Sequence, residues 1–228
     1  MTTTIAPTRH AASPETYRTR RQAMVASQLR TNAVNDPRVV VAMGKVPREL
    51  FVPEDEREFA YLDRQLALGR GRYMNLPMAT GRLLTEAYLE PDDRVLLIGS
   101  ATGYTAAVLA ELTAHVVAVE SDPALVEHAR GVLGGESRVE LVEAPMDEGA
   151  PDGAPYDVLI VDGAVEHLPD TLVDQVAAGG RVVTGIVDRG VTRLATGRKT
   201  DGGFGLSPFL DCDCVVLPGF AKPKAFTF

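Results

Sequence analysis

The sequence predicts an α/β fold: a doubly wound, mostly parallel sheet with helices on both faces, preceded by a helical N-terminal extension. Two observations support this expectation. From residue 94 onward, short apolar runs of strand length alternate with helical stretches, a pattern typical of parallel sheets. Residues 94–120 (RVLLIGSATGYTAAVLAELTAHVVAVE) also place a glycine turn after one buried strand and an acid at the end of the next. Ligands of such sheets bind at the carboxyl ends of the strands, so we expect the functional site there.

Composition narrows the class of protein. The chain has 228 residues, enough for one domain with a sizeable core. Its net charge is −8 and no long basic block is present, which does not favour binding to nucleic acid. No apolar run reaches the roughly 18 residues of a membrane span, and the N-terminal stretch MTTTIAPTRHAASPE has no apolar core of signal-peptide type. We therefore expect a cytoplasmic monomer with no membrane partner.

The two cysteines predict reduced thiols. Cys212 and Cys214 are one residue apart, so in a strand they project to the same face, and a disulfide between them would be strained. A metal site is the alternative, but two ligands without a neighbouring histidine cluster do not make one. No metal is expected.

The first elements are helical. Residues 1–12 are expected to be disordered. Ser13 and Pro14 then have the types favoured at a helix N-cap and first position, and a second helix is predicted to begin at residues 35–37. Residues 46–53 (VPRELFVP) lie between two prolines, which predicts an extended crossing with Leu50 and Phe51 buried. Residues 13–77 form the predicted extension and active-site loop.

Residues 66–77 (LALGRGRYMNLP) are predicted to form a glycine-punctuated loop. Arg70, Arg72, Tyr73 and Asn75 gather there, just before a helix predicted at residues 78–89. Polar residues on a loop held by rigid elements are good candidates for function. A solvated connector is the alternative interpretation.

The core, residues 78–228, continues with alternating elements. Strands are predicted at residues 95–98, 116–119, 139–142, 156–161 and 182–187, and helices at residues 104–112, 122–133 and 168–178, the last ended by the glycine pair at 179–180. Residues 191–197 and 205–216 are predicted to form a closing hairpin. The tail, residues 217–228, is aromatic and proline-rich and is expected to pack on the sheet.

The glycine turn indicates the kind of ligand. Glu120 follows Gly99 by about 20 residues, a distance at which a carboxylate can meet the ribose of a bound nucleoside. In the dinucleotide fingerprint the second and third glycines would fall on Ala101 and Tyr104, and the large tyrosine argues against NAD. The spacing G-x-x-x-G followed by tyrosine resembles motif I of class I S-adenosyl-L-methionine (SAM) methyltransferases. A glycine turn that serves packing alone is the alternative.

Further segments carry a family resemblance. QLR at residues 28–30, DPRV at 36–39, VPRELFVP at 46–53, AYLD at 60–63 and LGRG at 68–71 occur in that order, followed by VLLIGSATGY, VVAVE, APYDVLIVDGA and AAGGRVV. Over nearly its whole length the chain resembles the protein-L-isoaspartate O-methyltransferases. The resemblance implies a single SAM-methyltransferase domain over residues 1–228, with SAM as cofactor. It also implies a reaction: esterification of the side-branch carboxyl of isoaspartyl residues in damaged proteins, after which the ester collapses to a succinimide.

The resemblance also implies site residues. The cofactor would lie against Gly99, Ser100, Ala101, Thr102, Gly103, Tyr104, Glu120, Met146, Asp147 and Asp162. The chain departs from the family in three places. The acid two residues before the turn is Leu97, and the family's Gly-Asp-Gly falls on residues 144–146, with Asp147 one step late. The family's active-site loop, Gln-Thr-Ile-Ser-Gln-Pro, is RYMNLP here, so the family's hydroxyl falls on Asn75.

Methyl transfer to a carboxylate is compatible with this loop. A carboxyl group with a pKa near 4 is already ionised at pH 7, so the protein must mainly orient the oxygen and exclude water. An amide can donate the hydrogen bond that a hydroxyl would donate. If the loop is extended, Asn75 and Tyr73 face the same way, and Arg72 adds charge pairing; these three are the candidate catalytic residues. A SAM-dependent enzyme with another acceptor and a non-catalytic SAM-binding module remain alternatives.

Overall fold

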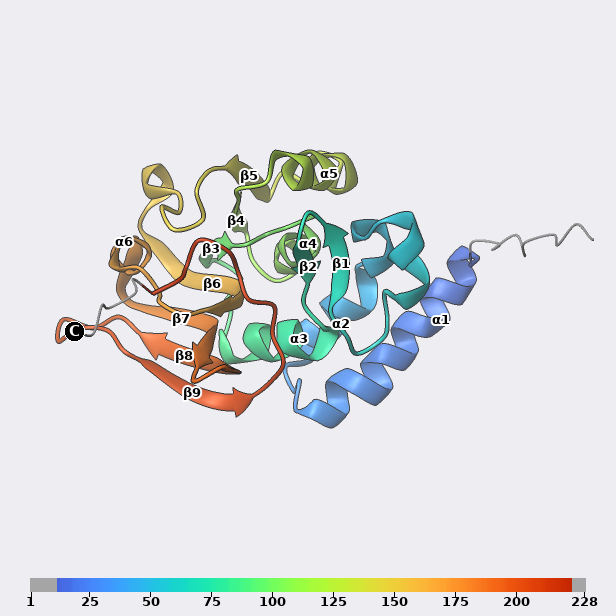
Figure 1. Ribbon diagram of the computed structural model, residues 1–228, viewed down its shortest axis with the longest axis horizontal. Coiled ribbons are helices and arrows are strands. Elements are labelled where there is room, and N and C mark those ends of the chain that lie inside the picture. The colour runs from blue at the N-terminus through green and yellow to red at the C-terminus, as the bar shows by residue number, and fades with distance from the viewer. Residues whose placement is uncertain (1–11, 223–228) are drawn as a thin grey trace, which may run out of the picture.

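A seven-stranded sheet forms the centre of the molecule (Figure 1), as seen in a computed structural model that describes residues 12–222. The strand order is β5-β4-β3-β6-β7-β8-β9. The five strands β5, β4, β3, β6 and β7 pair in parallel, and β8 and β9 are added in antiparallel orientation at the edge next to β7. The strands are β3 (Arg94–Ile98), β4 (His115–Glu120), β5 (Val139–Glu143), β6 (Tyr156–Val165), β7 (Val176–Asp188), β8 (Val191–Arg198) and β9 (Leu206–Asp211). The predicted mostly parallel α/β sheet is confirmed.

Helices cover both faces of this sheet. They are α1 (Pro14–Met24), continued by a π-helical turn, α2 (Pro37–Lys45), α3 (Pro77–Glu86), α4 (Tyr104–Ala110), α5 (Pro123–Leu133) and α6 (Asp170–Asp174). The predicted starts of two N-terminal helices are confirmed: the Ser13 hydroxyl accepts a hydrogen bond from the Thr16 N–H at 3.2 Å, and the Asp36 carboxylate accepts one from the Arg38 N–H at 2.8 Å. Both caps satisfy backbone donors that the first helical turn leaves free.

The alternation of side chains along β3 divides the core in two. Val95 and Leu97 pack with the N-terminal extension, α3 and α4, whereas Leu96 and Ile98 pack with α6 and the chain after β9. Successive residues of a strand face opposite sides of the sheet, so a strand buried on both sides is apolar throughout. The N-terminal extension is thus part of the larger core.

Several predicted elements were wrong in detail. Residues 66–77 are not a plain loop, because β1 (Leu66–Gly69) and β2 (Arg72–Met74) pair as an antiparallel hairpin. Residues 48–51 form a 3₁₀ turn rather than an extended crossing, so Phe51 is buried but Leu50 is exposed. Turns of this kind place consecutive side chains around an axis, and only one of the two can face the core.

The second half of the sheet also differs from the prediction. Strand β6 continues past Asp162 to Val165. The helix predicted at residues 168–178 is only α6, and β7 begins at Val176, so the glycine pair at 179–180 lies inside a strand. Strand β9 ends at Asp211 rather than at residue 216. Glycines are weak evidence for a helix end, because strands also use them where another backbone approaches closely.

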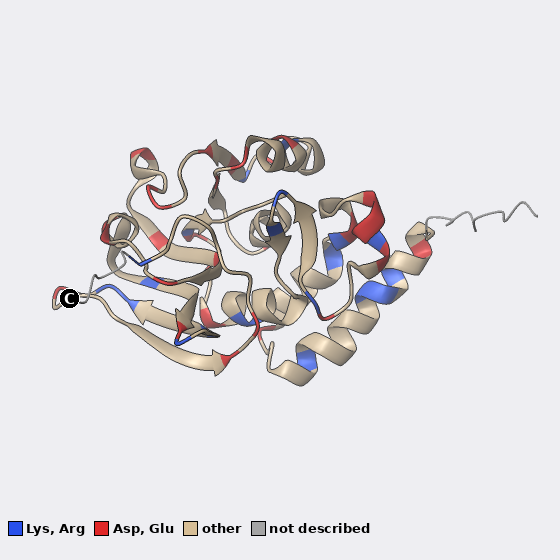
Figure 2. Ribbon diagram, in the orientation of Figure 1, with Lys and Arg blue, Asp and Glu red and all other residues tan. Residues whose placement is uncertain are grey.

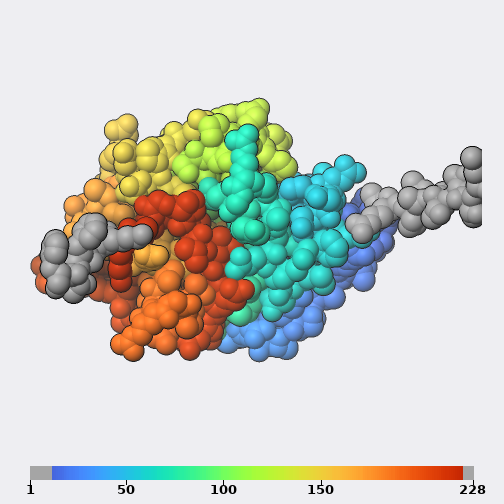
Figure 3. Space-filling model, in the orientation of Figure 1, coloured from blue at the N-terminus to red at the C-terminus, as the bar shows by residue number. Residues whose placement is uncertain are grey.

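The chain after β9 crosses the carboxyl ends of the parallel strands. Val216 pairs with Ala164 in a parallel bridge, with the Ala164 N–H donating to Val215 O and the Leu217 N–H to Ala164 O at 2.9 Å. Leu217 and Phe220 are buried against the sheet, which confirms the predicted packing of the tail as far as residue 222. Figure 3 shows this red segment on the surface between the orange strands and the cyan hairpin region. Residues 1–11 and 223–228, for which disorder and tail packing were predicted, lie outside the described part.

Acidic and basic residues are interspersed along the ribbon in Figure 2. Among the described residues, none of the helices combines the length and apolarity needed to cross a bilayer.

Candidate functional site

A small pocket lies at the carboxyl ends of β3 and β6, where the β2–α3 connection meets the glycine turn. It is lined by Tyr73, Met74, Asn75, Gly99, Ser100, Ala101, Thr102, Tyr104, Thr105 and Asp162. The structure therefore brings most of the predicted site residues together from three separate stretches of sequence. This is the edge of the sheet at which α/β proteins bind ligands.

The glycine turn follows β3 directly. Gly99 has φ +76°, and a Cβ at this position would lie 2.8 Å from the Cδ1 atom of Leu217. Both the backbone angle and the close approach of Leu217 require glycine. Ala101 also has a positive φ, 48°, and its N–H points at the Glu120 carboxylate, 2.9 Å from Oε2. The turn and the acid therefore form one hydrogen-bonded unit.

Glu120 is the most completely buried acid of the site. Its side chain is 0% exposed, and its Oε1 accepts hydrogen bonds from the N–H groups of Ser121 and Asp122 at 2.8 and 3.0 Å. Arg72 binds both carboxylate oxygens through its two terminal nitrogens, with Nη2 at 2.7 Å from Oε2. Arg72 is itself buried and does not line the pocket. The predicted role of Arg72 in pairing with an acceptor carboxylate is therefore not what this arrangement offers.

Asn75 is held between two other parts of the chain. Its Nδ2 donates to Asp162 Oδ1 at 2.8 Å, and its Oδ1 accepts from the Val215 N–H at 2.8 Å. The two residues differ in burial, since Asn75 is 2% exposed and Tyr73 45% exposed. Both still line the pocket, Tyr73 from its open side and Asn75 from within.

Asp162 receives further donors. The hydroxyl of Thr105 donates to its Oδ2, and that of Thr80 to its Oδ1 at 3.4 Å. Asp162 is thus a wall of the pocket that accepts hydrogen bonds from three neighbouring side chains.

Four predicted cofactor residues lie outside the pocket lining: Gly103, Glu120, Met146 and Asp147. Met146 is buried in the core beneath α6, and Asp147 is exposed, with its carbonyl accepting the Thr171 hydroxyl at 2.8 Å. Thr102 and Gly103 belong to the turn, but the Thr102 hydroxyl donates to Phe51 O at 2.6 Å, which ties the turn to the N-terminal extension.

The sequence analysis missed Arg48. This side chain is fully buried, its guanidinium lies 4.6 Å from the centre of the Tyr104 ring, and it donates to the carbonyl of Asn75. Burial lowers the pKa of Arg48 and raises that of the Tyr104 phenol. Arg48 lies in the segment VPRELFVP, which carries part of the family resemblance, so its motif was the signal. Leu217 left no comparable signal.

The cysteines do not line the pocket, although Cys214 lies beside Asn75. Cys212 and Cys214 are free and buried, and burial raises the pKa of the Cys212 thiol to about 11. Within residues 12–222, no cluster of three or more histidine, cysteine or acidic side chains could hold a metal ion.

The residues present fit SAM with one condition. The turn at residues 99–104 is buried, and the hydroxyls of Ser100 and Tyr104 within it have no hydrogen-bond partner among the described residues, so they are free to bind a polar ligand. Glu120 stands where a ribose acid is needed, but Arg72 occupies both of its oxygens. A ribose could therefore bond to Glu120 only if Arg72 moved.

The doubly wound sheet, with its glycine turn and an acid ending the next strand, has the architecture of the class I SAM-dependent methyltransferases. Within that class, the chain belongs to the protein-L-isoaspartate(D-aspartate) O-methyltransferase family, whose sequence model matches residues 19–217. The family resemblance and the fold class predicted from the sequence are both confirmed.

Individual relatives agree with this assignment. The chain is 40% identical to the protein-L-isoaspartate O-methyltransferase of a Synechococcus strain, over 92% of this chain and 83% of that protein. It is 38% identical to the Methanoculleus marisnigri enzyme of the same name, over 81% and 85%. A solved protein-L-isoaspartate O-methyltransferase superposes with a TM-score of 0.75 at 25% identity, over 87% of this chain and 66% of that one. A Plasmodium falciparum beta-aspartate methyltransferase, solved with S-adenosyl-L-homocysteine, has the same fold with a TM-score of 0.75 at 18% identity, over 86% and 97%.

Proposed function

We propose that this chain transfers a methyl group from SAM to the side-branch carboxyl of isoaspartyl residues in damaged proteins. The observation that carries the proposal is the pocket, in which the glycine turn meets the β2–α3 connection at the carboxyl ends of β3 and β6. Family membership supports the same reaction. The residues proposed to hold SAM are the turn, residues 99–104, together with Glu120 and Asp162.

Methyl transfer from SAM to a carboxylate needs little acid–base catalysis from the protein. SAM supplies an electrophilic methyl group, and an isoaspartyl carboxylate is already the nucleophile at neutral pH. The chain's task is to orient one carboxylate oxygen and exclude water. The free hydroxyls of Ser100 and Tyr104 are candidate donors, and Asn75 retains one amide hydrogen beyond the one given to Asp162.

Asp162 places a condition on this proposal, because a carboxylate in the pocket repels a carboxylate substrate. Its charge is offset by donors from Asn75 and Thr105 and by the electrostatic attraction of the buried Arg48 guanidinium. These groups lessen the repulsion between Asp162 and a carboxylate substrate.

The same acid favours a second candidate. If Asp162 is available to accept a proton or a hydrogen bond, the acceptor would carry a donor such as a hydroxyl or an amine instead of a carboxylate. That reaction would leave the fold and the cofactor unchanged and would give methyl products that survive mild base.

The test is methyl transfer from labelled SAM to a peptide carrying one isoaspartyl residue, beside the same peptide with normal aspartate. The proposal expects label on the isoaspartyl peptide alone, released as methanol in mild base because the product is an ester. Equal labelling of the two peptides, or label that resists base, would exclude the isoaspartyl carboxyl as acceptor and favour the second candidate.

A further inference from the structure

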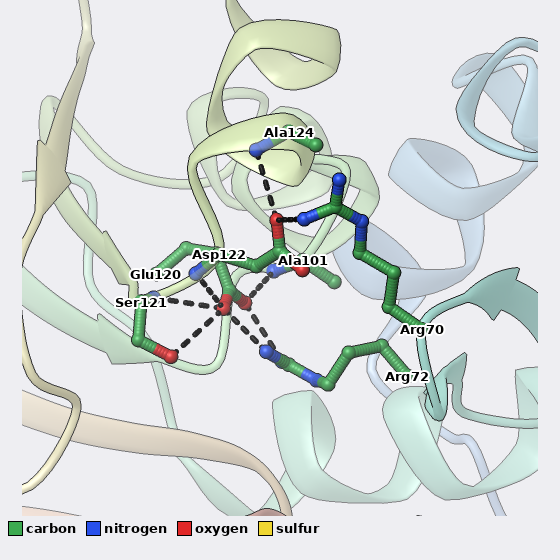
Figure 4. Close-up of polar contacts among 7 residues, drawn as sticks. All are labelled: Arg70, Arg72, Ala101, Glu120, Ser121, Asp122 and Ala124. Carbon is green, nitrogen blue, oxygen red and sulfur yellow. Dashed lines mark hydrogen bonds and ion pairs between the residues drawn. The ribbon is translucent and has the colours of Figure 1, made fainter.

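The β1–β2 hairpin places two arginines on the acids Glu120, which ends β4, and Asp122, which follows it (Figure 4). Arg72 binds Glu120 through two hydrogen bonds, and Arg70 Nη1 lies 3.8 Å from Asp122 Oδ1. The tip between the two strands consists of Gly69, Arg70 and Gly71, all with positive φ. This tight tip lets both guanidinium groups reach the same strand end from a hairpin of only a few residues.

Glu120 has no acceptor capacity left in this arrangement. Oε1 accepts from Arg72 Nη1 and from the N–H groups of Ser121 and Asp122, while Oε2 accepts from Arg72 Nη2 and from the Ala101 N–H. The Ser121 hydroxyl also donates to Oε1, at a long 3.4 Å. A carboxylate offers about four acceptor sites, and six donors already surround this one, so five remain even if the Ser121 hydroxyl turns away. A ribose hydroxyl can therefore donate to Glu120 only by replacing one of them.

The backbone donors cannot be the ones that leave. The N–H groups of Ala101, Ser121 and Asp122 belong to the turn and to the start of α5, whose positions follow from the strands. Arg72 is a side chain on a two-stranded hairpin, and a hairpin of this size is only marginally stable on its own. Its Nε is buried with no partner among the described residues, so Arg72 is not fully satisfied where it lies.

We propose that Arg72 is a latch on the cofactor site, which competes with the ribose of SAM for Glu120. The proposal rests on the proposed use of SAM and assigns to this chain a residue that sets its cofactor affinity. Binding then requires the Arg72–Glu120 pair to open. The pair is buried, and the attraction within a buried ion pair is largely offset by the desolvation of its charges, so the latch weakens binding without abolishing it.

The latch gives Glu120 a partner in the ligand-free protein. A buried carboxylate without a cation or a ligand would be costly. Arg72 supplies this cation, and SAM would have to displace it to bind Glu120. Removing the charge of Arg72 is therefore expected to lower the stability of the ligand-free protein and to raise its affinity for the cofactor.

The test is calorimetric titration of the full chain with S-adenosyl-L-homocysteine, the demethylated product, which binds without turnover. Arg72→Gln removes the charge and is expected to bind it about tenfold more tightly than wild type, with a lower ligand-free melting temperature and a larger ligand-induced rise. Arg70→Gln is the matched control on the same hairpin, because Arg70 is 72% exposed and its contact is long. Its affinity should stay within about twofold of wild type, as expected for a surface pair.

Equal or weaker binding by a folded Arg72→Gln variant would overturn the latch, and weaker binding would make Arg72 a cofactor ligand. If Arg72→Gln does not fold, Arg72→Lys keeps the charge but loses the two-pronged contact, and it should bind severalfold more tightly than wild type; unchanged affinity would count against the proposal. Because none of these readouts needs an acceptor, they separate the latch from the isoaspartyl assignment. If Arg72→Gln binds S-adenosyl-L-homocysteine more tightly but the isoaspartyl peptide is not labelled, the latch is supported and the isoaspartyl assignment is excluded.

Discussion

Among single residues, Asn75 shows how this chain has rebuilt the active-site loop of its family. The amide connects the end of β2 to Asp162 on β6 and to Val215 beyond β9. A hydroxyl is smaller and has a single donor, so it could not make both contacts over the same distances. Asn75 therefore positions one wall of the pocket, whatever further hydrogen bond it makes to the acceptor.

Replacing Asn75 should test this positioning. Asn75→Ala leaves the buried Val215 N–H unpaired and Asp162 Oδ1 with only the long contact from Thr80, at an expected cost of about 1–3 kcal/mol in the free energy of unfolding. Urea denaturation is the measurement. Asn32→Ala is the control, since Asn32 is exposed and bonds only within its own turn, and should change stability by less than about 0.5 kcal/mol. Equal effects of the two variants would show that Asn75 does not join these elements.

A second residue-scale prediction concerns alkaline pH. The unfolded Cys212 thiol ionises near its ordinary pKa of 9, whereas burial raises the pKa in the folded chain to about 11. The stability that comes from keeping this thiol neutral is complete below pH 9 and is lost as pH rises toward 11. Between pH 9 and 11 the urea midpoint of the wild type should therefore fall relative to that of Cys212→Ala. A constant difference from pH 8 to 11 would contradict the assignment.

Among the elements, the segment after β9 is the one whose contacts were least predictable from the sequence. Apolar runs and helix caps identified β3, β4 and α5, because periodicity and capping are local properties. The segment around Leu217 has no such pattern. Its place depends on two glycines, Gly99 and Gly163, which leave room for Leu217 at the ends of separate strands. Pairing between distant segments of this kind is not encoded in any one stretch.

Gly163 offers a direct test of that segment. A Cβ at Gly163 would lie 2.5 Å from Leu217 Cγ and 2.9 Å from Val215 O, so Gly163→Ala should displace the segment and cost about 1–3 kcal/mol, as overpacking does. Gly131→Ala is the control: Gly131 lies within α5 with nothing near its added Cβ, and alanine should stabilise the helix by about 0.5–1 kcal/mol. Thermal unfolding of both variants is the measurement. A neutral Gly163→Ala variant would mean that Leu217 does not pack there.

For the whole molecule, the sequence was sufficient for the fold class and for most of the pocket lining. Residues 99–104, Asn75, Tyr73 and Asp162 were identified from motifs and do gather at one sheet edge. The pairing of Arg72 with Glu120 was not predicted, because the two are 48 residues apart and each had been assigned a ligand of its own. Met146 and Asp147 were assigned by counting along a motif that the chain has altered, and both lie away from the pocket lining.

The central claim is that Glu120 and the turn at residues 99–104 form the cofactor site, closed by Arg72. A crystal structure of the chain with S-adenosyl-L-homocysteine tests it most directly. The account predicts the nucleoside at the turn, its ribose hydroxyls on Glu120, and no remaining hydrogen bond between Arg72 and Glu120. A ligand bound at the turn with the Arg72–Glu120 pair intact would contradict the latch, and a ligand bound elsewhere would contradict the site itself.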